Sequence, residues 1–280
     1  MESLEARAAA EARGGGRGGG DRRRRKKHNI EISDADWEAI RSFQATQLEQ
    51  KEGIEKLIDN IKGEINKLTD KTYDVQIEKI YDILNELISN ESFEEADKNK
   101  VGAVIFDIAS SNKFYSKIYA KLFSAINSKF DFMVNVFDLT RKSYMEKLTN
   151  IETVDPNKDY EKFCKINKDN ENRKALSSFF ANLMKEGVID IDIIISIANG
   201  LLDKVLDKIK TDSTEIVDQL SENISIIIQE SYEHIGNNDS DAAENIRNRV
   251  DHISKLKSKD YSGLTNKTIF QFMDIVENIN

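Results

Sequence analysis

The chain has 280 residues, of which 39% are hydrophobic and 32% are charged, and its formal net charge is −9. One proline and abundant charge favour long helices with solvated faces over a sheet protein. The single cysteine, Cys164, excludes an internal disulfide and a cysteine-based metal cluster. No apolar run reaches the roughly 18–20 residues of a membrane-spanning helix, and the N-terminus lacks the apolar core of a signal peptide. These features predict a cytoplasmic protein without membrane contact.

Residues 1–28 form a basic tail on an acidic chain. They carry nine Lys or Arg against four Asp or Glu, whereas the remaining residues carry 32 against 46. The glycine-rich run 14–20 cannot bury apolar surface, so we expect residues 1–30 to be disordered. RNA contact is one interpretation of this tail, and a solubilising or nuclear-import tail is the other. The candidate RNA-binding residues are Arg13, Arg17, Arg22, Arg23, Arg24, Arg25, Lys26 and Lys27.

Residues 31–51 are predicted to form an N-terminal arm. Ser33 and Asp34 suit the N-cap of a short helix that carries Trp37, Ile40 and Phe43. Trp37 is the only tryptophan of the chain. It either packs on the first helical pair or anchors a partner, because tryptophan buries a large area with few rotatable bonds.

From residue 52 onward, apolar residues recur at helical spacing to the end of the chain. Asp155 and Pro156 mark a turn, and Gly187 stands where a helix C-cap is expected. Ten helices in series predict an all-α fold, an α-solenoid of about five antiparallel helical pairs over residues 52–280. Periodicity alone describes a compact bundle equally well. The helices are predicted at about residues 52–68, 77–88, 93–110, 113–127, 129–149, 159–186, 191–209, 213–235, 239–257 and 266–279.

The sequence offers no catalytic constellation. His28, His234 and His252 lie far apart and lack metal-ligand spacing. Cys164 follows Phe163 on an apolar helix stripe, which predicts a buried structural thiol rather than a nucleophile. The glycine tract has neither the spacing of a phosphate loop nor a strand beside it. We therefore predict that the protein is not an enzyme and binds no metal or cofactor.

Three segments in chain order carry a family resemblance. Residues 65–73, Ile-Asn-Lys-Leu-Thr-Asp-Lys-Thr-Tyr, resemble the Leu-Asn-Lys-Leu-Thr motif that opens the middle domain of eukaryotic translation initiation factor 4G. Residues 114–122, Phe-Tyr-Ser-Lys-Ile-Tyr-Ala-Lys-Leu, are similar to that family's second helical pair, and residues 173–189 are similar to its third-repeat helix. With the helices that follow, the resemblance covers about residues 52–280.

The resemblance implies a crescent of HEAT repeats that binds a DEAD-box RNA helicase of the initiation factor 4A type and contacts mRNA. Such a scaffold holds the two helicase lobes half-open, a population shift that needs contacts at two separate surfaces. Within the opening motif it assigns helicase binding to Ile65, Leu68 and Tyr73, with Trp37 upstream as a further anchor. The same apolar residues also end the first helix stripe, so burial within the first helical pair is the alternative.

The chain also departs from that family. None of its eight tyrosines has a leucine five positions later, so the usual motif for a cap-binding protein is missing and recruitment would need a non-standard interface. A body rich in Ile, Asn, Lys and Asp suits a protist or a large DNA virus, in which case the protein would act in the host cytoplasm. Two alternatives to a translation-initiation scaffold are a related domain of an mRNA splicing, decay or nuclear cap-binding factor, and a helical interaction module without an RNA role.

Overall fold

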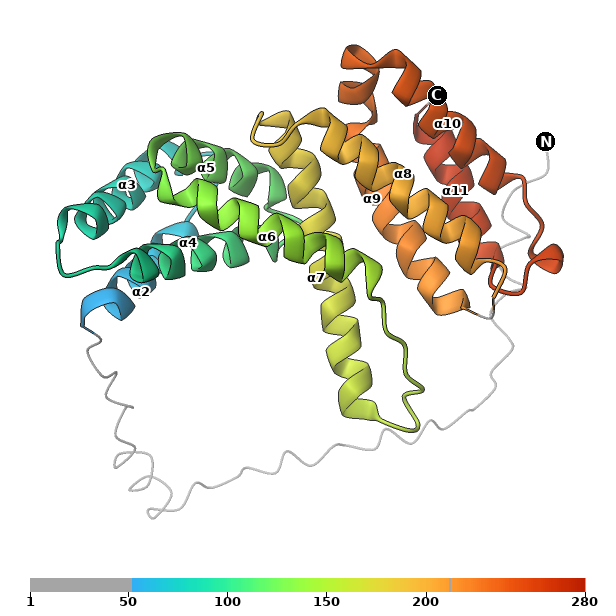
Figure 1. Cartoon of the computed structure of the whole chain (residues 1–280), viewed down its shortest axis with the longest axis horizontal. Coiled ribbons are helices and arrows are strands. Elements are labelled where there is room, and N and C mark those ends of the chain that lie inside the picture. The colour runs from blue at the N-terminus through green and yellow to red at the C-terminus, as the bar shows by residue number, and fades with distance from the viewer. Residues whose placement is uncertain (1–51, 212, 280) are drawn as a thin grey trace, which may run out of the picture. The chain divides into compact units, whose positions relative to one another are not determined.

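The structure is a computed structural model that describes residues 52–211 and 213–279. The described part belongs to one unit of the chain, Gln50–Asn280, and contains helices without any strand, which confirms the predicted all-α fold. Figure 1 shows their arrangement. The helices are α2 (Gly53–Ile65), α3 (Tyr73–Ser89), α4 (Glu95–Ser110), α5 (Ser116–Lys129), α6 (Phe132–Thr149), α7 (Tyr160–Lys185), α8 (Ile191–Lys208), α9 (Thr214–Asn238), α10 (Ser240–Ser254), the 3-10 helix η2 (Ser258–Asp260) and α11 (Asn266–Asn278).

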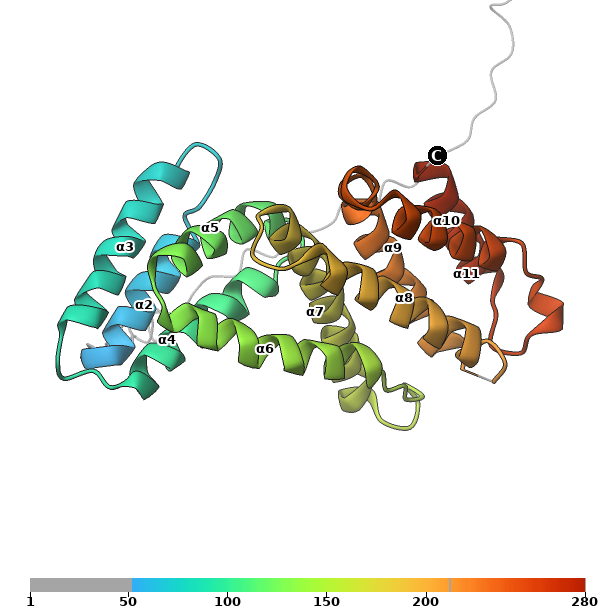
Figure 2. The same ribbon diagram turned by 45° about the horizontal axis from the view of Figure 1, so that its top comes forward.

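Consecutive helices pack in pairs, and the pairs stack on one another. Helix α2 lies against α3, α4 against α5, α8 against α9 and α10 against α11. Figures 1 and 2 show the first and last of these pairs side by side. Alternate helices also touch, with α2, α4 and α6 in one row and α5, α7, α9 and α11 in another. Contacts to the next helix and to the next but one are the arrangement of an α-solenoid, which decides against a compact bundle.

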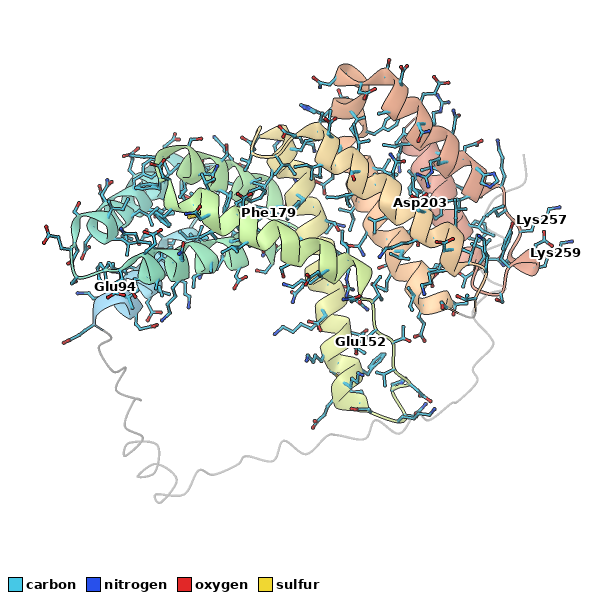
Figure 3. The ribbon with its side chains drawn as sticks, in the orientation of Figure 1. Glu94, Glu152, Phe179, Asp203, Lys257 and Lys259 are labelled. Carbon is cyan, nitrogen blue, oxygen red and sulfur yellow. The ribbon has the colours of Figure 1, made fainter. Side chains whose placement is uncertain are left out.

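The stacked helices repeat at a spacing close to that of HEAT-type repeats, which are about 40–47 residues long. Four side-chain contacts between stacked helices join residues 45 to 48 positions apart. The α5–α7 step is longer, because Asn182 Nδ2 donates to Ser116 Oγ, 66 positions away. The additional residues form the segment 150–159 and the first turns of α7. This part extends beyond the neighbouring helices in Figure 1, and Figure 3 labels Glu152 within it. The four contacts are Glu55–Lys100, Glu230–Asn182, Asp203–Arg249 and Glu222–Lys267.

Three phenylalanines from three different helices meet in the core. Phe106 of α4, Phe123 of α5 and Phe179 of α7 have ring centroids 5.6 to 5.9 Å apart and rings nearly perpendicular. All three are fully buried, and Figure 3 labels Phe179 within the helical body. Edge-to-face packing of this kind adds about 0.5–1.5 kcal/mol per pair to the burial of the rings. The cluster therefore ties α4, α5 and α7 together.

The end of α7 confirms the predicted C-cap. Gly187 has φ of +72°, a left-handed conformation that glycine adopts without a side-chain clash. Its N–H donates to the carbonyl of Met184 at 3.0 Å, and the N–H of Val188 donates to that of Leu183 at 2.9 Å. These two bonds form a Schellman motif, which ends the helix and turns the chain toward α8.

The projecting turns of α7 overturn one prediction. Cys164 is exposed, so the expectation of a buried thiol was wrong. The apolar residues near it, Phe163 and Ile166, are half-buried. Lys162 pairs with Glu152 of the segment 150–159 at 3.1 Å. Among the described residues, no helix combines the length and apolarity needed to cross a membrane.

Replacing Phe179 tests the role of the phenylalanine cluster. We expect Phe179→Ala to lower the free energy of unfolding by about 3–5 kcal/mol, because it leaves a cavity among three buried rings. The measurement is urea denaturation followed by circular dichroism. Phe114→Ala is the matched control, because that side chain is 96% exposed and should change stability by less than about 0.5 kcal/mol. Equal effects of the two replacements would refute the role of the cluster.

Candidate functional site

The predicted helicase-binding residues fall at the turn between α2 and α3. Ile65 ends α2, Leu68 lies in the turn and Tyr73 begins α3, and all three side chains are buried in the core. Ile65 and Leu68 therefore hold the first helical pair together, and a partner at this turn has to touch its exposed neighbours. Trp37 and the basic tail residues lie outside the described residues.

Hydrogen bonds between two threonines shape this turn. Thr72 Oγ1 donates to the carbonyl of Lys67 at 2.7 Å and accepts from the N–H of Thr69 at 2.9 Å. The N–H of Thr72 also donates to the carbonyl of Thr69 at 3.1 Å. Because side chain and backbone are both bonded, the turn holds Asp70 and Tyr73 in fixed positions.

An exposed pair of aromatic side chains lies at the start of α5. Phe114 is 96% exposed and Tyr115 is 46% exposed. The Asn112 side chain accepts from the N–H of Phe114 at 3.1 Å, and the Tyr115 ring stacks on that of Tyr119 with centroids 5.8 Å apart. The two adjacent side chains form a contiguous apolar patch, and such patches are typical of interaction surfaces.

These aromatic residues border a hollow of about 500 Å³, which we call the turn pocket. Its apolar wall comes from the start of α5, its floor from Tyr73, and its remaining wall from the α2–α3 turn and the end of α7. The residues used below are Tyr73, Phe114, Tyr115, Lys117, Ile118 and Lys121, with Asp70 and Glu186 on the other side. A pocket of this size suits one anchor of a bound segment, since ligand sites span about 300–1,000 Å³.

Two cation–π contacts align α5 with α3. The ammonium of Lys121 lies 4.1 Å from the centroid of the Tyr73 ring, and that of Lys129 lies 3.8 Å from the centroid of Tyr81. The two tyrosines are eight residues apart on α3, and the two lysines are eight residues apart on α5. The two helices therefore run parallel and in register. Each contact contributes about 0.5–1 kcal/mol at an exposed site, and the first places a positive charge over the pocket floor.

The hydroxyl of Tyr73 is buried and has no hydrogen-bond partner among the described residues. Burial also raises the pKa of Tyr73 to about 12. A buried hydroxyl without a partner costs about 1–3 kcal/mol. The hydroxyl is closed off from solvent, so other atoms of Tyr73 line the pocket floor.

Helix α5 and the residues just before it are basic, although the chain as a whole is acidic. No Asp or Glu occurs between Asp107 and Asp131, and the four lysines in between are all exposed. The charge pattern was visible in the sequence, but its value as a signal was missed because the lysines form no compact run. The four are Lys113, Lys117, Lys121 and Lys129.

A second exposed apolar surface lies on α11, in the last helical pair. Phe270 is 62% exposed and Met273 is 50% exposed, three positions apart on the same helix face. The partly buried side chains of Ile269 and Val276 adjoin them on that helix. The two surfaces lie at different stages of the stack, one on the second pair and one on the last.

No side-chain cluster in residues 52–279, position 212 aside, has the composition of a metal site. The hollow beside the projecting turns of α7 is lined by residues of both charges, among them Lys165, Asp169 and Arg173. Arg173 is buried there and donates from Nε to the carbonyl of Lys147 at 2.9 Å. Its guanidinium thus supports the end of α6.

The comparisons with known proteins do not assign a family. A scan of the chain against protein-family models finds no match, and a search of curated proteins finds none. The resemblance to the middle domain of initiation factor 4G therefore rests on the three sequence segments 65–73, 114–122 and 173–189 alone.

The Tyr73 hydroxyl gives a prediction for alkaline pH. The pKa of Tyr73 in the folded protein, about 12, lies above its ordinary value of 10. Its contribution to stability is therefore complete below pH 10 and is lost as the pH rises from about 10 to about 12. We expect Tyr73→Phe to be at least as stable as the wild type at neutral pH, and to lose less stability across that window. The free energy of unfolding in urea at several pH values measures both. Parallel losses in the two proteins would contradict the assignment.

Proposed function

We propose that this chain is a non-enzymatic helical scaffold that docks a DEAD-box RNA helicase of the initiation factor 4A type in translation initiation. The observation that carries the proposal is the exposed aromatic pair, Phe114 and Tyr115, beside a turn that resembles the family's helicase-binding motif. Tyrosine and other aromatic side chains are favoured at the centres of protein interfaces. Docking at this turn thus involves the surface around the motif more than its buried leucine and isoleucine.

A scaffold changes a two-lobed partner only if it binds one lobe arrangement more tightly than the others. That requirement is met by two contact surfaces at separate places on one rigid body. The turn pocket and the Phe270–Met273 face supply such surfaces on α5 and α11. We assign them to the two helicase lobes, so that the helical stack between them sets the spacing of the lobes.

Contact with mRNA is proposed for the basic tail, because Arg and Lys neutralise phosphates and release counterions. A cap-binding protein would have to use another, non-standard interface. Nothing in the described residues favours a splicing, decay or nuclear cap-binding factor over a translation factor, since these differ in the helicase bound and in compartment. A helical interaction module without an RNA role remains the alternative of another class.

Helicase binding tests the proposal directly. Purified initiation factor 4A should bind the chain in a pull-down and show a higher RNA-stimulated ATPase rate. We expect Phe114→Ala combined with Tyr115→Ala to weaken binding at least about tenfold, with an unchanged free energy of unfolding. Tyr160→Ala is the matched control, because it removes an exposed aromatic ring from the projecting end of α7. Absence of binding and of any rate change in the wild type would refute the helicase partner.

The tail is tested separately by deletion. We expect removal of residues 1–28 to weaken binding to single-stranded RNA and to flatten its dependence on salt, because fewer counterions are released. Fluorescence anisotropy at several salt concentrations measures both quantities. An unchanged slope would exclude the tail as the RNA contact.

A further inference from the structure

The α5 side of the turn pocket carries two exposed lysines. The Lys121 ammonium lies 4.1 Å from the centroid of the Tyr73 ring. Lys117 lines the pocket one helical turn before Lys121. A carboxylate fits this combination, because it pairs with the ammonium groups of neighbouring lysines.

The charges around the pocket are divided between its two sides. Lysines stand on α5, where the chain carries no acidic residue from position 108 to 130. Asp70 of the turn and Glu186 at the end of α7 stand on the other side. A polyanion such as RNA would run along these two carboxylates and be repelled, whereas a single carboxylate directed at α5 avoids them. The arrangement therefore favours a peptide over a nucleic acid.

The apolar wall of the pocket provides the second element of recognition. Phe114 and Tyr115 are exposed, and Ile118 follows them on the pocket side of α5. An aliphatic or aromatic side chain packed here would cover area that is otherwise in water. Because this apolar wall lies next to the lysines, the apolar side chain and the carboxylate have to be neighbours in the bound segment.

We propose that the turn pocket binds an acidic segment of a partner protein, in which a carboxylate adjoins an apolar anchor. The carboxylate pairs with Lys117 and Lys121, and the anchor packs on Phe114 and Tyr115. This inference rests on the proposed function in so far as the pocket is a docking site, and it specifies the chemistry of the docked segment.

The test uses three fluorescein-labelled probes with the full-length chain. The first is a short peptide of alternating Asp and Leu, the second is the same peptide with Asn for Asp, and the third is single-stranded oligouridine. We expect the Asp–Leu peptide to bind at least about tenfold more tightly than the Asn–Leu peptide. Lys121→Gln should weaken binding of the Asp–Leu peptide by about threefold or more, because one ion pair with the carboxylate is lost. The Asn–Leu peptide should be affected much less.

Charge reversal supplies the matched control. Lys117→Glu with Lys121→Glu should abolish binding of the Asp–Leu peptide. Lys257→Glu with Lys259→Glu changes the net charge equally at exposed sites near η2, which Figure 3 labels on the far part of the stack, and should leave binding unchanged. Equal binding of the two peptides, equal effects of the two double variants, or tighter binding of oligouridine at the same lysines would each overturn the proposal.

The helicase assay separates this inference from the proposed function. A chain that discriminates between the peptides but does not bind the helicase supports the acidic-segment site and refutes the proposed partner. A chain that binds the helicase through Phe114 but treats both peptides alike refutes the acidic-segment site alone.

Discussion

Phe179 packs edge-to-face against Phe106 of α4 and Phe123 of α5, and this contact joins the α4–α5 pair to α7 at the centre of the stack. A single amphipathic pair cannot bury both of its apolar faces, so each pair depends on its neighbours. Helix α7 carries most of that dependence, because it contacts α4, α5, α6, α8 and α9. Loss of its core would therefore separate the first pairs from the last.

A polar contact accompanies the apolar one and sets the register. The side-chain amide of Asn182 donates to Ser116 on α5 at 3.1 Å and to the carboxylate of Glu230 on α9 at 2.6 Å. A shift by one helical turn would break both of these hydrogen bonds between helices. Apolar packing thus holds the helices together, while Asn182 fixes the axial position of α7 relative to α5 and α9.

The candidate docking surface follows from the same constraint. Stacking buries the helix faces but leaves the turns and helix starts in solvent, and there the chain can carry an aromatic pair without disturbing the core. Phe114 and Tyr115 lie at the start of α5, on a backbone held by Asn112 and beside a turn braced by two threonines. Rigid support of this kind lowers the entropy that a partner must overcome to bind.

The sequence alone determined the helices, because apolar spacing and capping residues such as Gly187 are local signals. The resemblance drew attention to the α2–α3 turn, but whether its residues face solvent was left open. Only the tertiary structure decided that Ile65 and Leu68 are buried, that Cys164 is exposed and that Phe114 stands in water beside Tyr73. Periodicity shows which residues share a helix face, but what covers that face depends on helices distant in the sequence. For α5 and α7 those partners are separated by more than 60 residues, a distance that no local pattern reports.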